Sequence, residues 1–494
     1  MEIEDKKTIA KNIGWLTFSK IFVYLLSIVT ITLIPRYLGV TGYGQLNFAL
    51  SFVGIFSIIA NIGLGVLIFR DVSKNKKLLN LYFNNFFYLK LICIFLFGII
   101  VYLVSLFLNK PFIVKALIIV FIFFNMIQSF SGYFGNFLNA FEKMKYESIR
   151  EIILKLGIVI GLLFVIYLNK GVLGVSLSYV LGSILGLIFI LYNFVKFFKN
   201  RIKFKPKLDV NFIKEKSKIF WPFALSGLFG LIYFNFDRFM ISLFINDYQV
   251  GLYSIGYSFY GFMIGVIAIF STTFFPQLSI ATKSKKQFKD IFNKFTKVVL
   301  TLAVPLCFGS IFLSKEIILL VFGKDFVLGN IAFKLIMLFF LFNAINQIFN
   351  NSLNVYDYQR YQFKMVLIAS IVNVLLNFIA IPLFGIIGAG ITTIISEVII
   401  FIGVYYKFRK DILKQTNFFR NLIVPFVSGI IMLLGIFLIK DILNIIFLQN
   451  SLNVLGYAVI GGLIYFICIF LFKYIRIKEI LFLINPIINK FRKK

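Results

Sequence analysis

Histidine is absent from the sequence, and cysteine occurs only three times, at Cys93, Cys307 and Cys468. The commonest metal ligand and the usual general base of enzymes are therefore missing. The three cysteines are far apart, and each lies within an apolar run, which predicts neither a metal site nor a disulfide framework. We expect that the protein holds no metal and no cofactor.

Charged residues are scarce, at 14% of the sequence against about 25% in a soluble domain. The chain has no Gly-x4-Gly-Lys-Ser/Thr phosphate loop, no Asp-x-Asp pair and no long polar segment for a nucleotide-sugar domain. These absences argue against an ATPase and against a polyprenol-linked glycosyltransferase or polymerase, so we do not expect an enzyme. The net charge of +32 would suggest nucleic acid in a soluble protein, but the basic residues lie in short loops between apolar runs. No nucleic-acid partner is expected.

Hydrophobic residues make up 60% of the sequence, and the mean hydropathy is +0.96. Apolar stretches of about 20 residues recur along the chain, and each can cross a hydrocarbon core of ~30 Å. Because backbone groups in lipid must satisfy their own hydrogen bonds, these stretches predict helices. We expect an all-α polytopic membrane protein with about 14 transmembrane helices, the first of them retained and not cleaved as a signal peptide. The expected ranges are 10–35, 44–69, 84–108, 112–140, 150–168, 172–195, 219–246, 250–278, 295–313, 327–353, 364–383, 386–406, 420–440 and 452–474.

Lys and Arg are distributed unevenly between the loops. Of the 51 basic residues, 39 fall in the two tails and in the loops after even-numbered spans, and only seven in the loops after odd-numbered spans. Because cytoplasmic loops carry the excess of Lys and Arg, this bias predicts a multi-pass protein of the cell membrane with both termini in the cytoplasm.

Three landmarks recur at nearly one spacing. Gly44 and Gly251 lie in the similar segments YGQLNFALSF and VGLYSIGYSF, 207 residues apart. Glu142 and Asp357 lie in LNAFEKMKY and LNVYDYQRY, 215 residues apart, and the segments GVLG and GIIG that open the sixth and twelfth spans are 214 apart. Such self-similarity indicates an internal repeat of six helices in parallel topology.

The repeat predicts two pseudo-repeated six-helix lobes plus a C-terminal helix pair. The expected parts are an N-terminal lobe (1–195), a basic cytoplasmic linker (196–218), a C-terminal lobe (219–410) and a terminal helix pair with a basic tail (411–494). Two such lobes could rock about a central cleft, which is the geometry of alternating access.

The chain resembles the polysaccharide (O-antigen-type) flippases in three segments, IPRYLGVTGYGQLNFALSF (34–52), NIGLGVLIFRDVSKN (61–75) and FWPFALSGLFGLIYFNFDRFMISLFINDYQVGLYSIGYSF (220–259). That family belongs to a superfamily that also includes multidrug exporters and the lipid II flippase. The resemblance implies a two-lobe transporter that moves a polyprenyl-pyrophosphate-linked oligosaccharide from the inner to the outer leaflet. It also implies that basic residues in a central cavity engage the pyrophosphate.

Five basic residues lie well inside the expected spans, at least five positions from either end: Lys20, Lys90, Lys155, Arg238 and Lys334. A charge at the bilayer centre costs about 2.5–3.5 kcal/mol on insertion scales, so a central one is a functional candidate. Lys20 and Arg238 lie deep in the first span of each lobe, where we expect both to line the cavity and contact phosphate. An interhelical salt bridge is the alternative for Arg238. For Lys155 and Lys334, near the starts of their spans, we expect snorkelling to the interface; for Lys90, snorkelling and substrate binding are both open.

Two further arginines at membrane edges are candidates for substrate binding. Arg36 could gate the outer mouth or anchor its helix at the interface. Arg70 lies at the cytoplasmic end of the second span, where substrate would be collected, and positive-inside anchoring is its alternative.

Asp237 and Glu397 are the acidic residues placed convincingly inside spans. A buried carboxylate with a raised pKa is the expected device for coupling transport to protons or sodium ions, and charge pairing is the alternative. Amides form a stripe on one face of the tenth span, where Asn343, Gln347 and Asn350 are substrate-binding candidates beside Asn346 and Asn354. A similar stripe in the fourth span contains Asn125, Gln128, Asn136 and Asn139. Amides suit sugar hydroxyls, and hydrogen bonds between packed helices are an equal alternative.

A multidrug or cation exporter of the same superfamily is the alternative function. A cationic cargo would call for an acidic cavity, whereas the intramembrane charges are five basic and two acidic. The expected partners are a polyprenyl-pyrophosphate-linked glycan, membrane lipids, a coupling proton or sodium ion, and the polymerase and glycosyltransferases of the same pathway. We expect a monomer. The sugar and the polymer pathway are not encoded in any of these patterns.

Overall fold

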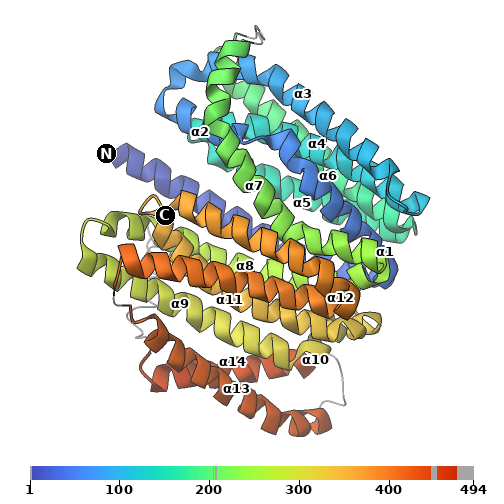
Figure 1. Ribbon diagram of the computed structural model, residues 1–494, viewed down its shortest axis with the longest axis vertical. Helices are drawn as coiled ribbons and strands as arrows, with labels where there is room; N and C mark the ends of the chain where they lie inside the picture. Colours follow the sequence, from blue (N-terminus) through green and yellow to red (C-terminus); the bar gives the residue numbers. More distant parts are fainter. Residues whose placement is uncertain (1–2, 204, 206–208, 415, 447–452, 475–494) are drawn as a thin grey trace. The chain divides into compact units, whose positions relative to one another are not determined.

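The computed structural model describes residues 3–203, 205, 209–414, 416–446 and 453–474, and every regular element in that part of the chain is a helix (Figure 1). Two short 3₁₀ helices, η1 (Lys76–Leu78) and η2 (Lys324–Gly329), lie between α-helices. The α-helices are α1 (Ile3–Asn61), α2 (Leu64–Lys74), α3 (Leu79–Leu106), α4 (Phe112–Ala140), α5 (Met144–Tyr167), α6 (Gly171–Phe198), α7 (Val210–Phe244), α8 (Asp247–Ala281), α9 (Lys285–Phe312), α10 (Ser314–Val321), α11 (Asn330–Asn354), α12 (Gln359–Asp411), α13 (Phe418–Ile446) and α14 (Asn453–Leu471). The predicted all-α architecture is confirmed.

Eleven stretches of the described chain are long and apolar enough to cross a membrane. Two of them, Phe18–Lys74 and Gln359–Asp411, have 57 and 53 residues, and since about 20 suffice for one crossing, each can cross twice. α5 is not among the eleven, because five charged residues occupy its first half. With α5 and the two double crossings, the described helices supply the predicted number of spans. The protein is therefore a multi-pass α-helical membrane protein.

Both long helices contain a glycine where one crossing ends and the next begins. Gly39 in α1 has φ 66° and ψ 179°, and Gly385 in α12 has φ 61° and ψ −141°. Glycine adopts these positive φ values without the clash that a Cβ would cause. Pro35 and Pro382 lie shortly before the two glycines, and each removes a backbone donor from its helix. The loops that the sequence predicts at these points are therefore kinks within continuous helices.

The chain divides into two compact units, of which unit 1 comprises Met1–Ser254 and Val366–Ala389. Within it, α5 packs on α6, α6 on α4, and α1 contacts α3, α4, α5 and α7 (Figure 1). A cluster of aromatic rings fills the core where α3, α4 and α6 meet; Phe83 lies 5.4 Å from Phe194 and 5.6 Å from Phe137 between ring centroids. Rings at this spacing stabilise the packing beyond their buried area.

Unit 2 comprises Ile255–Met365 and Gly390–Lys494. In it, α9 packs on α11 and α13, and α13 pairs with α14, as Figure 1 shows. Its core is also aromatic, with the ring of Phe408 lying 4.6 Å from Phe292 and 5.3 Å from Phe349 between centroids. The predicted boundaries divide α7 between the linker and the second lobe, whereas α7 belongs to unit 1 and packs along α1. The lobe boundaries themselves stay a prediction, and part of the expected linker and of the basic tail lies outside the described residues.

The predicted repeat is visible in the backbone. The turns after α4 and after α11 each contain one non-glycine residue in the left-handed region, Glu142 and Asp357, both with φ 61°. In both copies the next amide closes the turn onto a carbonyl five residues earlier, from Lys143 to Leu138 and from Tyr358 to Leu353. Gly171, which opens α6, has φ 60°, and its counterpart Gly385 has φ 61°. Positions that match in sequence thus adopt the same conformation.

Candidate functional site

A line of polar side chains runs between α1 and α5 in unit 1, and we call it the polar seam. Its members are Lys20, Tyr24 and Thr30 of α1 and Glu151 and Lys155 of α5. Lys155 Nζ donates to Thr30 Oγ1 at 2.9 Å, and Lys20 lies near enough to Glu151 to stabilise its carboxylate electrostatically. Lys20 with Tyr24, and Glu151 with Lys155, are spaced by four residues, so each pair occupies one helix face. The sequence predicts that the Lys155 side chain snorkels to the membrane interface. Instead, this side chain contacts α1.

A second set of charges lies next to the seam on α5. Arg150 is 7% exposed; its Nε and Nη2 donate to Glu147 Oε1 at 3.0 and 2.5 Å. Its Nη1 donates to Gln128 Oε1 of α4 at 2.9 Å. A buried guanidinium is stable only when such donors are satisfied. Gln128, which belongs to the predicted amide stripe of the fourth span, thus bonds a neighbouring helix.

Arg238 and Lys20 lie on helices that pack together, although each faces its own neighbours. Arg238 Nη2 donates to Phe234 O at 2.8 Å and to Asn235 Oδ1 at 3.3 Å, all within α7. Phe239 of α7 stacks on Phe52 in the second half of α1, with 5.9 Å between ring centroids. Lys20 lies in the first half of α1, towards α5. The predicted contact of both cations with phosphate across a cleft stays a prediction.

Asp237, the neighbour of Arg238, is only 1% exposed. Its Oδ2 accepts a hydrogen bond from the Tyr253 hydroxyl at 2.9 Å, and its Oδ1 accepts one from Asn377 Nδ2 at 2.7 Å. Asn377 Nδ2 also lies 3.1 Å from Asn373 Oδ1, one turn away on α12. The Tyr253 hydroxyl and the Asn377 amide are uncharged donors that do not titrate near neutral pH.

Lys90 of α3 is 3% exposed and donates to three acceptors of the protein. Its Nζ lies 2.6 Å from Ser129 Oγ, 2.7 Å from Ala60 O and 3.2 Å from Asn61 Oδ1. Ala60 is in the last turn of α1, where carbonyls lack helical partners and the helix dipole favours a cation. Lys90 thus caps α1 before the break that leads to α2, and it does not snorkel. Its role in substrate binding stays a prediction.

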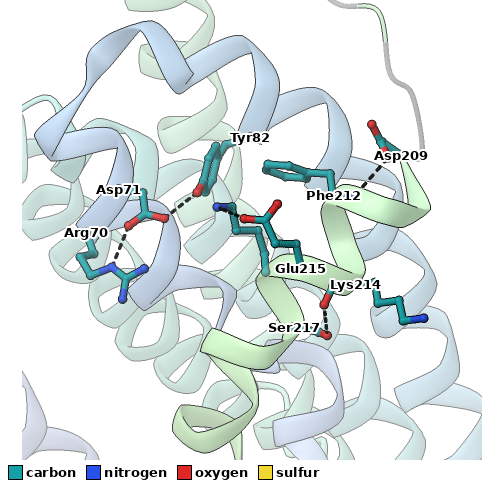
Figure 2. Close-up of polar contacts among 9 residues, drawn as sticks. Arg70, Asp71, Tyr82, Asp209, Phe212, Lys214, Glu215 and Ser217 are labelled. Carbon is teal, nitrogen blue, oxygen red and sulfur yellow. Dashed lines mark hydrogen bonds and ion pairs between the residues drawn. The ribbon is translucent and has the colours of Figure 1, made fainter.

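The two edge arginines lie near opposite ends of the second crossing. Arg36 is exposed close to the kink of α1. Arg70, near the end of α2, pairs through Nε with Asp71 Oδ1 at 2.7 Å, and the Tyr82 hydroxyl donates to Asp71 Oδ2 at 2.5 Å (Figure 2). The Arg70 side chain is still 39% exposed, so it remains accessible from this end of unit 1. Collection of substrate at Arg70 is not tested by this geometry.

In unit 2, the predicted amide stripe surrounds a buried acid. Glu397 is 1% exposed, and its Oε1 accepts from Asn343 Nδ2 at 2.7 Å and from Asn346 Nδ2 at 3.2 Å. Gln347 Oε1 accepts from the hydroxyl of Ser271 at 3.0 Å. The carbonyl of Asn350 accepts from Gln362 Nε2 at 2.6 Å. The side-chain amides of Asn343, Asn346 and Gln347 therefore bond neighbouring helices, as the second of our two interpretations expects, whereas Asn350 does so through its main-chain carbonyl. Contact of these residues with sugar stays a prediction.

The repeat-related glycines Gly44 and Gly251 meet where α1 crosses the start of α8. A Cβ on Gly44 would lie 1.7 Å from the carbonyl oxygen of Asp247, and one on Gly251 would lie 2.1 Å from that of Val40. Val40 and Asp247 are separated by the same 207 residues as the glycines, so the contact is reciprocal between the two copies. Lys110 Nζ, from the loop before α4, pairs with Asp247 Oδ1 at 2.9 Å. We call this arrangement the glycine crossing.

The sequence reasoning missed the charges of α5. The charge distribution assigns Arg150 to a basic loop, and the predicted site residues include neither Glu147 nor Glu151. Their spacing of four residues, continued by Lys155, was a readable sign of a polar helix face. Within the described residues, no group of three or more His, Cys, Asp or Glu side chains could hold a metal ion. Paired charges inside apolar helices suit the binding of an ion or an anionic group better than bond-making chemistry.

Comparison with known families gives two matches. The family described as "Polysaccharide biosynthesis protein" matches residues 9–282, which is more than half of the chain. The MatE family matches residues 222–379. The first match contains the polar seam, Lys90, Arg238 and the glycine crossing.

Among curated proteins, the chain is similar to "Uncharacterized membrane protein MJ1068" of Methanocaldococcus jannaschii, with 27% identity over 394 residues, 76% of this chain and 75% of that protein. It is also similar to "Probable low-salt glycan biosynthesis flippase Agl15" of Haloferax volcanii, with 24% identity over 35% of this chain and 37% of that protein. Among solved structures, it is similar to "Lipid II flippase MurJ, inward closed conformation", with a TM-score of 0.74 and 20% identity over 92% of this chain and 97% of that one. A multidrug resistance MATE family transporter in its inward-facing conformation has a TM-score of 0.63 and 14% identity over 79% of this chain and 95% of that one. At these identities the solved structures establish a shared fold.

Proposed function

Because the chain belongs to the polysaccharide biosynthesis protein family, within the superfamily of multidrug and polysaccharide exporters, we propose that it flips a polyprenyl-pyrophosphate-linked oligosaccharide from the cytoplasmic to the outer leaflet. The observation that carries this proposal is the family match over residues 9–282, which contains the helices that bear Lys20 and Arg238. Similarity to the "Probable low-salt glycan biosynthesis flippase Agl15" of Haloferax volcanii supports a glycan cargo, and similarity to the "Probable flippase AglR" of the same organism supports flipping.

The charges inside unit 1 support an anionic cargo. Lys20 of the polar seam and Arg238 of α7 lie within spans that are mostly apolar. Arg can bind phosphate bidentately and Lys as a point charge, so both are suitable ligands for a pyrophosphate. In this proposal the substrate engages Lys20 and Arg238, while Arg150 and Lys90 keep their structural partners. The exposed side chain of Arg70 is suited to collect substrate at the cytoplasmic end.

The cycle would follow alternating access, and Asp237 and Glu397 are the proposed coupling groups for a proton or a sodium ion. Both carboxylates are buried and accept hydrogen bonds from neutral side chains. Coupling is not obligatory, because moving an anion outward down an inside-negative potential yields about 2.3 kcal/mol per charge per 100 mV. The protein would act as a monomer in the cytoplasmic membrane with both termini inside. Polymerase and glycosyltransferases of the same pathway would consume and supply its substrate.

The test measures lectin or glycosidase access to a labelled polyprenyl-pyrophosphate glycan in proteoliposomes that contain the purified protein. The double variant K20Q/R238Q should reduce the flipping rate by about tenfold or more, since each lost contact with phosphate is worth about 1.5–3 kcal/mol. The matched control K115Q/K170Q removes two basic residues from helix ends and should flip at the wild-type rate. Equal rates in the double variant and its control would defeat the assignment of these residues.

The competing function, export of organic cations, predicts a different result in the same vesicles. An exporter would accumulate a cationic dye under an ion gradient and leave the lipid-linked glycan unmoved. Dye transport without glycan flipping would therefore replace the proposal.

A further inference from the structure

The segment that leaves α6 is fixed along the first turns of α3 by side-chain amides. Asn80 Nδ2 donates to Arg201 O at 3.0 Å, and Asn80 Oδ1 accepts from the amide of Lys203 at 2.9 Å. Asn84 repeats the pattern one step further, with 3.0 Å to Lys203 O and 3.1 Å from the amide of Lys205. We call these contacts the asparagine ladder.

The ladder works because two different repeats coincide in length. Four residues of an α-helix rise about 6.0 Å, and two residues of an extended strand rise about 6.6 Å. Side-chain amides spaced by four residues on α3 can therefore hydrogen-bond the backbone of every second residue of an extended chain. They take the part that a neighbouring strand has in a sheet. Asn85 Oδ1 then accepts from the amide of Asp209 at 2.9 Å, and Asp209 caps α7 through Oδ1 and the amide of Phe212 at 3.0 Å (Figure 2).

Among residues 201–203 and 205, the described part of this segment, the ladder holds alternate positions to α3, so that residues two apart face the same way. Ile202 is partly buried against the aromatic core of unit 1. Arg201, Lys203 and Lys205 belong to the other face, and all three are exposed. We call these three residues the basic strip. The backbone of these residues is hydrogen-bonded to the side chains of Asn80 and Asn84, and these bonds fix the spacing of the three charges.

Aromatic rings and further cations continue the strip at the ends of α4 and α6. The guanidinium of Arg201 lies 4.7 Å from the ring centroid of Phe197 and 5.8 Å from that of Phe141. Lys76 lies 4.8 Å from the Phe141 centroid, and Lys143 lies 5.4 Å from the Phe197 centroid. Cations placed over ring faces keep part of their donors free for an anion.

From this geometry we infer that the basic strip is a docking surface for the headgroups of anionic phospholipids in the leaflet that faces this end of unit 1. The strip begins where the membrane-spanning helix α6 ends, so its exposed charges stand at the level of lipid headgroups. Anionic leaflets attract basic residues close to their surface, and a fixed row of cations gains most from this attraction. The surface is separate from the residues of the proposed transport path and does not depend on the cargo.

The test uses the full-length chain in a neutral detergent, titrated with phosphatidylglycerol, with bound lipids counted by native mass spectrometry. Phosphatidylcholine serves as the zwitterionic comparison. The triple variant R201Q/K203Q/K205Q should bind phosphatidylglycerol about a hundredfold more weakly, because each basic residue near a lipid surface contributes about fivefold to affinity. Binding should also weaken when the ionic strength rises from about 0.1 to 1 M, where the screening length falls from about 10 to 3 Å.

Two further variants decide whether the fixed strip is responsible. K283Q/K285Q/K286Q removes the same charge from exposed positions before and at the start of α9 and should change affinity less than twofold. N80A/N84A keeps every charge but removes the ladder, and it should weaken binding. If both charge variants bind equally weakly, or if N80A/N84A binds like the wild type, the proposal is overturned.

A last arm separates lipid from soluble phosphate. Inorganic pyrophosphate at a concentration equal to the saturating lipid should leave the bound phosphatidylglycerol in place. Displacement by pyrophosphate would identify a site for free phosphate groups and would overturn the assignment to lipid.

Discussion

Asp237 and Arg238 are adjacent in the sequence and have different surroundings. Neighbouring residues on a helix point about 100° apart, so the two side chains meet different groups. Asp237 is buried against Tyr253 and Asn377, whereas Arg238 is partly buried and bonds back to its own helix. At the scale of single residues, the burial of a charge therefore has to be explained by its own partners.

Replacing Asp237 by Asn keeps the shape of the side chain and removes its charge. We expect D237N to lower gradient-driven flipping in proteoliposomes by about tenfold or more, because an amide cannot bind and release a coupling ion as a carboxylate does. The measurement compares flipping rates with and without an imposed proton or sodium gradient. D290N, an exposed acid of α9, serves as the control, and full gradient dependence in D237N would exclude it as the coupling group.

Replacing Lys90 by Met should act on stability more than on transport. The change removes the charged donor that the carbonyl of Ala60 and the side chains of Asn61 and Ser129 share. The single Ser129 hydroxyl, which lies within reach of the first two acceptors, cannot donate fully to both, and a buried acceptor that loses its donor costs about 1–3 kcal/mol. We expect a lower midpoint in thermal unfolding of the detergent-solubilised protein, while K115M leaves the midpoint nearly unchanged. An undiminished midpoint together with lost flipping would instead assign Lys90 to the substrate.

At the scale of the elements, apolar length predicted the helices well, and polar faces determined how they are arranged. α5 could be placed from its apolar second half, but its contact with α1 depends on Lys155 and Thr30, which only the folded chain brings together. The asparagine ladder was not predictable either, because Asn80 and Arg201 are separated by 121 positions. In contrast, the shared turn at Glu142 and Asp357 could be predicted, since the two copies have similar sequences there.

The glycine crossing gives a prediction for packed helices. In G44A the new methyl group would lie 1.7 Å from the carbonyl oxygen of Asp247, so α1 and α8 must separate locally. Overpacking of this kind costs about 1–3 kcal/mol, and thermal unfolding should report it. G251A should behave alike, and G132A, whose Cβ would meet no atom within 4 Å, should be neutral.

The double variant G44A/G251A tests the reciprocity. Since one separation relieves both clashes, its cost should be smaller than the sum of the two single changes. Strict additivity would show that the two contacts are independent.

At the scale of the whole molecule, the distribution of Lys and Arg predicts which side of the membrane each loop faces. The number of helices alone does not give this orientation. The described helices agree with an even number of crossings, but which side each loop faces depends on charge and on the membrane. The arrangement of the predicted lobes depends on contacts between residues far apart in the sequence, and no periodicity encodes those contacts. Composition therefore gave the class and the spans, and the pairing of side chains had to come from the structure.

Labelling with a membrane-impermeant thiol reagent tests that topology. The three native cysteines are buried, and a C93A/C307A/C468A background provides a silent reference. In intact cells, K170C should react with the reagent, and K286C should react only after the membrane is opened, because the two exposed positions lie on opposite sides in the predicted topology. Reaction of both in intact cells would invert or miscount the predicted spans.

The glycine crossing also limits how far the two copies of the repeat can diverge. In each copy a glycine makes room for the backbone of the other copy. A larger residue at either glycine would therefore disturb a contact to which both copies contribute. Elsewhere the duplicated segments can drift apart until their common origin is erased. At Gly44 and Gly251 the likeness is retained by present-day contact, and it would persist however ancient the duplication was.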